Sequence, residues 1–232
     1  MSRLLGAKQN FVKHIWMKVC KFESGLVGNI YCAGRNYLAH AAELGNAPAK
    51  DQPFFFLKPT SSLVFAPDAI VIPRGAELHH EVELAVVVKN KIDRPLLTEA
   101  EALGQILGYC TVIDVTARNW QDEAKAKRLP WTLAKGCRTF LPCSSEMVCL
   151  DDVGAAVDLE LKVNGVAKQQ ASTATMIHSV PQLLMYLSGF HTLLPHDMVL
   201  TGTPSGVGPM LSGDVVEISA FGISTRFAVE SE

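Results

Sequence analysis

The sequence has little net charge and no long apolar run. Among its 232 residues, 21 Lys and Arg stand against 23 Asp and Glu, which gives a formal net charge of −2 at pH 7. Nucleic-acid-binding domains usually carry a strong basic excess, so no nucleic acid is expected as a partner. The longest apolar runs are of strand length, far below the roughly 20 residues that span a membrane. We therefore expect a soluble protein with a small-molecule partner.

Several familiar site signatures are also absent. The six cysteines include no C-x-x-C pair, and Cys137, Cys143 and Cys149 recur at an interval that matches no common zinc site. Free thiols in a reducing compartment are expected instead. The glycine-rich stretch 202–208 lacks both the G-K-[ST] ending of a P-loop and the G-x-S-x-G elbow of a serine hydrolase. It can still present backbone N–H groups to an anion.

The chain contains no repeat, low-complexity segment or interdomain linker. A single domain is therefore expected. The first 22 residues hold five basic residues and no acid, as organellar presequences do, but they include only one Arg and one Ser. A cytoplasmic protein is expected, with a mitochondrial one as the alternative.

Local signals predict several elements of secondary structure. Thr98 and Glu101 form a capping box that opens a helix to about residue 107, and Thr116 is the expected N-cap of a further helix. The Asn164-Gly165 pair predicts a tight hairpin turn after the strand 158–163. A helix is expected over 177–187, and a last hairpin is expected from the strands 214–218 and 224–229.

Two carboxylates interrupt an apolar, strand-forming run at residues 79–88. Alternate residues of a strand point to the same side, so Glu81 and Glu83 are expected to lie side by side. A buried pair of like charges needs a cation or a proton, and a third carboxylate, Asp114, ends the next predicted strand, 108–113. Oxygen ligands without His or Cys suit Mg²⁺ or Mn²⁺ better than Zn²⁺. The competing interpretation is a solvated strand edge.

These residues belong to an ordered set of motifs. The set resembles the fumarylacetoacetate hydrolase family, most of all its single-domain, acylpyruvase-like branch, and the resemblance runs from about residue 30 to the C-terminus. It therefore implies one catalytic domain over residues 30–232 after an N-terminal extension, residues 1–29. The motifs are Gly34-Arg35-Asn36-Tyr37, Phe56-Leu57-Lys58-Pro59, Glu81-Val82-Glu83, Asp114, Ala134-Lys135-Gly136 and Thr201-Gly202-Thr203-Pro204.

The resemblance implies the fold and the assembly. It indicates an α+β fold that is mostly β, with mixed sheets rolled into a barrel-like core, peripheral helices, and a homodimer. The predicted strands themselves outnumber the helices and do not alternate with them, which argues against a doubly wound or TIM-barrel fold.

His40 and Glu43 lie three residues apart on an Ala-rich helix expected within residues 35–45, where they are neighbours. Alone, such a pair is usually a surface hydrogen bond. The resemblance instead implies a His-x-x-Glu dyad on a lid over the substrate, with His40 as the base. Relatives commonly carry Asp before this His, and the present chain has Ala39.

The resemblance also assigns residues around the substrate. Lys135 is expected to stabilise an enolate, and Arg118 suits a carboxylate, although a surface pairing with Asp122 or Glu123 is its competing interpretation. The other expected contacts to oxygens of the substrate or of bound water come from Arg35, Lys58, Gln121 and Thr203. The resemblance also allows Lys58 to pair with an acid of the site.

The implied activity is metal-dependent hydrolysis of an acylpyruvate, a small 2-oxo acid, to pyruvate and a carboxylic acid. The same enolate stabilisation serves decarboxylation or keto–enol tautomerisation of oxaloacetate, which the family also performs. A non-catalytic oxoacid-binding protein is the remaining alternative, but it would have no need of the base at His40.

Overall fold

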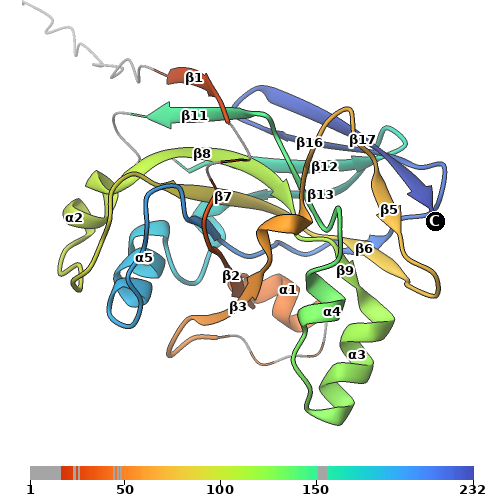
Figure 1. Ribbon diagram of the computed structural model, residues 1–232, viewed down its shortest axis with the longest axis horizontal. Coiled ribbons are helices and arrows are strands. Elements are labelled where there is room, and N and C mark those ends of the chain that lie inside the picture. Colours follow the sequence, from red (N-terminus) through yellow and green to blue (C-terminus); the bar gives the residue numbers. More distant parts are fainter. Residues whose placement is uncertain are drawn as a thin grey trace, which may run out of the picture.

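The structure is a computed structural model and describes residues 17–22, 25, 27–43, 45, 47, 49–150 and 156–232. Most of the expected presequence therefore lies outside the described residues, as do positions 44, 46 and 48 near the expected lid. The described chain is mostly β, with three sheets and a few short helices (Figure 1). Among the described helices, none has the length and apolar character that crossing a membrane requires.

The largest sheet has nine strands and mixes parallel with antiparallel pairs. Its main path runs β1 (Met17–Lys21), β11 (Glu146–Leu150), β8 (Ile106–Ile113), β7 (Val82–Val88), β14 (Met198–Leu200), β2 (Ile30–Gly34) and β3 (Phe54–Lys58), while β10 (Leu141–Cys143) joins β8 to β4 (Leu63–Phe65). The expected mixed sheets are confirmed, but the path ends at β1 and β3 and does not close into a barrel among the described strands. Strand β1, from the expected extension, pairs with β11.

Two smaller sheets complete the β structure. The five-stranded sheet runs β13 (Val166–Ser172), β12 (Asp158–Val163), β16 (Val215–Ala220), β17 (Ile223–Ser231) and β5 (Ile70–Ile72), and the three-stranded sheet runs β15 (Gly208–Pro209), β6 (Leu78–His80) and β9 (Thr116–Ala117). The predicted turn between β12 and β13 is confirmed, because Asn164 and Gly165 have φ values of 52° and 78°.

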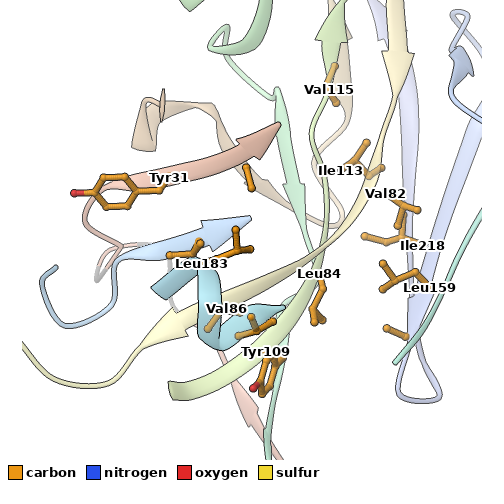
Figure 2. Close-up of a cluster of buried hydrophobic side chains, with 14 of the residues drawn as sticks. Tyr31, Val82, Leu84, Val86, Tyr109, Ile113, Val115, Leu159, Leu183 and Ile218 are labelled. Atoms are coloured by element: carbon orange, nitrogen blue, oxygen red, sulfur yellow. The ribbon is translucent and has the colours of Figure 1, made fainter. Parts of the chain in front are cut away.

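The core lies between the largest sheet and the five-stranded sheet. Leu84 and Val86 of β7 point into it and share it with Leu159 and Ile218 of the five-stranded sheet (Figure 2). The alternate residues Ala85 and Val87 belong to a second apolar cluster. Every residue of β7 is consequently buried, and a carboxylate on this strand is costly unless it finds a partner.

The helices are short and peripheral: α1 (Leu38–Glu43), α2 (Glu99–Gly104), α3 (Arg118–Lys127), α4 (Thr132–Lys135) and α5 (Val180–Ser188), with 3₁₀ turns at Thr60–Ser62 and Thr173–Thr175. The capping box of Thr98 and Glu101 is confirmed. The expected extension of that helix to residue 107 is wrong, because β8 takes over the chain at Ile106.

Two further helix predictions need correction. Thr116 does not cap a helix, because it lies in β9 opposite His79 of β6, and α3 begins after Ala117 without a side-chain cap. The helix expected from residue 177 starts later, at α5, where Ser179 and Gln182 form a capping box. The sequence also gave no sign of α4, which presents Lys135 at its last position.

Candidate active site

The three predicted carboxylates meet in the structure. Glu81 lies between β6 and β7, where the chain passes from the small sheet into the largest one, so the expected continuous strand is broken there. Glu83 lies in β7, and Asp114 directly follows β8. The Asp114 N–H donates to the Glu81 carbonyl oxygen at 2.8 Å, which joins the end of β8 to Glu81. All three side chains are buried, and each offers an oxygen within 4.8 Å of the others.

This cluster fits a divalent cation. Burial, Asp114 and Glu81 together raise the pKa of the Glu83 carboxyl well above its ordinary value, so the charged form is disfavoured without a further positive charge. Asp114 Oδ1 is buried and has no hydrogen-bond partner. The Lys58 ammonium lies 2.8 Å from it but donates to three backbone carbonyl oxygens instead. Carboxylate oxygens alone are the ligands that Mg²⁺ and Mn²⁺ prefer.

Two buried cations hold the outer oxygens of the cluster. Lys135 Nζ donates to Glu81 Oε2 at 2.9 Å and to Asp114 Oδ2 at 2.6 Å. Burial alone would lower the pKa of Lys135, but Asp114 and Glu81 raise it to about 12. Arg118 Nη2 donates to Glu81 Oε1 at 2.5 Å. Burial opposes the charge of Glu81, yet Lys135 and Arg118 bring the pKa of that carboxyl below its usual range. The two carboxylates therefore favour the charged form of Lys135.

Arg118 and Gln121 occupy one face of α3, as their spacing predicts. Arg118 Nη1 donates to Gln121 Oε1 at 2.7 Å, and both side chains are buried. The competing pairing of Arg118 with Asp122 or Glu123 is wrong, because Glu123 pairs with Lys127 and Asp122 with Lys125. Arg118 thus braces Glu81 and offers the remainder of its guanidinium to the cavity.

Lys58 stands behind the carboxylates. Its ammonium donates to the backbone carbonyl oxygens of Val115 at 3.1 Å and Phe140 at 2.8 Å, and also to the carbonyl oxygen of Lys135. With Asp114 beside it, the side chain is fully enclosed. Of its two expected partners, acid or substrate, the structure shows the acid.

The glycine-rich loop that follows β14 binds two carboxylates of the protein itself. Gly202 N–H donates to Glu83 Oε2 at 2.7 Å, and Gly206 N–H donates to Glu43 Oε1 at 3.0 Å. Both glycines have positive φ, at 91° and 94°. A Cβ on Gly206 would lie 2.2 Å from the Lys168 carbonyl oxygen, so only glycine fits there. The loop thereby positions one residue of the cluster and one of the dyad.

His40 and Glu43 are neighbours on α1. His40 is buried and its Nδ1 lies 3.4 Å from Glu43 Oε2, at the outer limit of a hydrogen bond. Since the other oxygen of Glu43 accepts from Gly206, this carboxylate links the helix to the loop. With Nδ1 turned to Glu43, Nε2 is the ring nitrogen left to exchange a proton.

Gln169 of β13 is a buried residue of the site that sequence reasoning missed. Its Oε1 accepts from the Val82 N–H at 3.0 Å and lies 3.0 Å from His80 Nδ1. Its Nε2 donates to Thr203 Oγ1 at 2.9 Å. Thr203 in turn donates to the Val82 carbonyl oxygen at 2.9 Å, so the expected hydroxyl donor is engaged with the backbone. Gln169 lies in a polar-looking strand, and no sequence signal marks it.

Arg35 enters the site from a left-handed backbone conformation, with φ at 58°. Such a conformation costs on the order of 1 kcal/mol or more outside glycine. The next residue secures it: Asn36 Nδ2 donates to the carbonyl oxygens of Thr201 at 2.8 Å and His178 at 2.9 Å. Asn36 was part of a motif in the sequence, but its role as an anchor was not predicted.

These groups surround one small cavity. It encloses about 40 Å³, in a measure in which one water needs about 10–15 Å³, so it suits a small ligand. The predicted residues that line it are Arg35, His40, Glu81, Glu83, Asp114, Arg118, Gln121, Lys135 and Thr203; Glu43 and Lys58 stand behind them. Its outer wall, which the sequence did not indicate, consists of Phe54, Phe56, Lys125 and Trp131.

Comparison with known proteins agrees with this geometry. The model of the fumarylacetoacetate (FAA) hydrolase C-terminal domain matches residues 29–228. The chain belongs to the fumarylacetoacetate hydrolase family. It is 47% identical over 208 residues to a mitochondrial oxaloacetate tautomerase of Arabidopsis thaliana, covering 87% of this chain and 90% of that protein. It is 44% identical over 200 residues to a mitochondrial oxaloacetate decarboxylase of Dictyostelium discoideum, covering 84% and 90%.

Solved structures of the fumarylacetoacetate hydrolase family share the fold. The crystal structure of fumarylpyruvate hydrolase from Pseudomonas aeruginosa, in complex with Mn²⁺ and pyruvate, superposes with a TM-score of 0.80 at 30% identity and covers 89% of this chain and 91% of that one. The chain is thus an enzyme of this family. These two relatives are named for reactions of oxaloacetate, whereas the sequence analysis expected hydrolysis of an acylpyruvate.

Proposed function

We propose that this protein catalyses keto–enol tautomerisation of oxaloacetate at a divalent metal centre, Mg²⁺ or Mn²⁺. The observation that carries the proposal is the buried His40 in the same cavity as the three converging carboxylates. Tautomerisation moves a proton between carbon and oxygen, which requires a base, whereas decarboxylation requires only stabilisation of the charge left on the carbon. The names of the relatives point to the same substrate.

Glu81, Glu83 and Asp114 would hold the metal ion. When bound, the ion acts as a Lewis acid toward the carboxylate and carbonyl oxygens of a 2-oxo acid. The buried ammonium of Lys135 keeps its charge, since its pKa is raised to about 12, and it therefore favours the enolate form of the substrate. This charge acts without any proton transfer from Lys135.

His40 is the group that moves the proton. In the keto-to-enol direction, Nε2 takes a proton from C3 of oxaloacetate, and the electron pair of that C–H bond becomes the C2–C3 double bond. The C2 oxygen then takes this proton from Nε2, which returns His40 to its neutral form. Glu43 contacts Nδ1 and stabilises the imidazolium that forms, while Gly206 fixes Glu43. The reverse sequence returns the keto form, and neither direction consumes a proton.

The remaining residues of the cavity orient the substrate. Arg35, Arg118 and Gln121 line the cavity and supply donors for carboxylate oxygens. Lys58 and Thr203 act through the protein: Lys58 braces Asp114 from behind, and Thr203 ties its loop to β7. Because these supports are buried, the cavity is preorganised before a substrate enters.

Hydrolysis of an acylpyruvate is the second candidate. The same dyad, His40 and Glu43, can take a proton from a water that attacks the distal carbonyl, and Lys135 then stabilises the departing pyruvate enolate. The structural relative with bound pyruvate supports this candidate for the site. Tautomerisation remains the proposal because the relatives of higher identity carry the oxaloacetate names.

A panel of substrates separates these reactions. The metal-loaded protein is incubated with oxaloacetate, acetylpyruvate and fumarylpyruvate, and loss of enol absorbance and formation of pyruvate are followed separately. Tautomerisation gives fast enol loss from oxaloacetate without pyruvate. Pyruvate from oxaloacetate would instead indicate a decarboxylase, and pyruvate from an acylpyruvate a hydrolase.

We also propose a mitochondrial location and a homodimer. The location is supported by the relatives named mitochondrial and by the basic, acid-free stretch of the first 22 residues. The homodimer rests on the family resemblance alone. Cell fractionation tests the first proposal, and light scattering after size-exclusion chromatography tests the second, where twice the monomer mass is expected.

A further inference from the structure

The mouth of the cavity carries a lysine to which nothing so far gives a role. Lys125 lines the cavity from α3, on the same face as Arg118 and Gln121, at positions i, i+3 and i+7. Seven residues advance a helix by about 10 Å. Arg118 contacts Glu81, and Lys125 lines the same cavity from about two helical turns further along α3. The two side chains are thus separate positive charges on the wall of one cavity.

A pair of aromatic rings positions Lys125 together with Arg35. Lys125 Nζ lies 5.7 Å from the centre of the Trp131 ring, and Arg35 Cζ lies 5.8 Å from the centre of the Phe54 ring. The two rings are themselves in edge contact, with centres 5.5 Å apart. Cations at these distances are held by the faces of the rings. Two positive side chains from α3 and from the turn before α1 therefore flank one aromatic wall of the cavity.

Lys125 is not strongly engaged by acids of its own helix. Its nearest carboxylate is Asp122, at 3.4 Å, and the Asp122 side chain is 63% exposed, so that pair contributes little. By contrast, Lys127 pairs with Glu123 at 2.5 Å. Lys125 is also half-buried, with 32% of its side chain exposed, whereas Lys127 is 60% exposed. An ordinary surface lysine would resemble Lys127.

The excess of positive charge expected at the metal-loaded site favours a substrate with two negative charges. The three buried carboxylates of the cluster are matched by three buried cations, Lys58, Arg118 and Lys135. A divalent ion would then add two positive charges, and Arg35 and Lys125 add two more at the mouth. A substrate with a single carboxylate and an apolar tail would offer no carboxylate to the mouth cations. A second carboxylate at the far end of the substrate pairs with them.

We propose that Lys125 and Arg35 form a carboxylate subsite that selects dicarboxylic 2-oxo acids by their distal carboxylate. This proposal rests on the proposed function for the location of the 2-oxo acid end of the substrate. Lys125 is a specificity-determining residue here and takes no part in the proton transfer. It explains how one family site can prefer oxaloacetate to an acylpyruvate with an apolar tail.

The test compares two inert ligands on the Mg²⁺-loaded protein. Malate and 2-hydroxybutyrate have the same carbon count and the same 2-hydroxy acid end, but only malate has a distal carboxylate. Calorimetry with the unmodified chain should show tighter binding of malate. Lys125→Gln should weaken malate binding by about 3- to 10-fold, the loss expected for a partly exposed charge-assisted contact. Binding of 2-hydroxybutyrate should change less than twofold.

Lys127→Gln is the matched control, since it removes a lysine of the same helix that does not line the cavity. It should leave both ligands unaffected. Equal effects of Lys125→Gln on both ligands, or no effect on malate, would overturn the subsite, as would failure of malate to bind the unmodified protein. If malate selectivity depends on Lys125 but oxaloacetate is not turned over, the subsite stands and the proposed reaction fails.

Discussion

Replacing Glu83 by Gln tests whether the carboxylate cluster exists to bind a metal ion. The substitution keeps the shape of the side chain and its acceptor oxygen for the Gly202 N–H, but removes one negative charge from the cluster. Without metal, burial disfavours that charge, and Asp114 and Glu81 repel it as well. The variant is therefore expected to be more stable than the unmodified protein when no metal is present.

The size of the effect follows from the distances. Two like charges within 4.8 Å of each other repel by about 3.5 kcal/mol at an effective dielectric constant of 20. Lys135 and Arg118 neutralise much of the charge on the two neighbours. A net gain of about 1–2 kcal/mol in the free energy of unfolding is expected, which raises Tm by about 2–8 °C for a chain of this size.

Thermal unfolding in EDTA and in Mg²⁺ measures the stability of each protein without and with the metal ion. At a metal concentration 1,000 times Kd, the free energy of unfolding of the unmodified protein should rise by about 4 kcal/mol. That of Glu83→Gln should rise little. Glu160→Gln, which changes a glutamate on β12 outside the cluster, should respond to Mg²⁺ as the unmodified protein does. A Glu83→Gln variant that is less stable in EDTA and fully stabilised by Mg²⁺ would refute the reasoning.

Two further substitutions test the supports of the site. Lys58→Met should lower the free energy of unfolding by about 3–5 kcal/mol in urea titration, because it leaves the buried Asp114 without that cation. Lys89→Met, at an exposed position, should have almost no effect on the free energy of unfolding. Equal losses for the two variants would show that Lys58 does not stabilise the buried carboxylate. Gly206→Ala should lower activity at least tenfold through displacement of Glu43, because its Cβ meets the Lys168 carbonyl oxygen at 2.2 Å. Gly213→Ala has a similar φ, 93°, but open space around its Cβ, so a matching loss of activity there would count against the displacement.

Short-range signals predicted the parts of the fold that depend on neighbouring residues. The turn at Asn164-Gly165 and the capping box of Thr98 and Glu101 each involve a few consecutive residues, and both are present. The convergence of Glu81 and Glu83 followed from the alternation of strand residues, even though the strand is broken at Glu81. Asp114 joined them because β7 and β8 pair antiparallel.

Partners distant in sequence account for what the sequence did not predict. Thr116 is a good N-cap residue, but pairing with β6 draws it into a strand. Gln169 acts through Val82, His80 and Thr203, which lie 34 to 89 positions away. Lys125 lies against Trp131, whose ring is in edge contact with Phe54, 71 positions before Lys125. Such contacts leave no mark on local composition.

The central claim, proton transfer by His40 to a 2-oxo acid held at the carboxylate cluster, is tested most directly by the relaxation of enol-oxaloacetate to the keto form. The rate is measured with equal concentrations of the unmodified protein and His40→Ala, both loaded with Mg²⁺. Because His40 is the base and not a metal ligand, the variant should keep its stabilisation by Mg²⁺ and lose about 10²- to 10⁴-fold in rate. Equal relaxation rates for the two proteins would contradict the account.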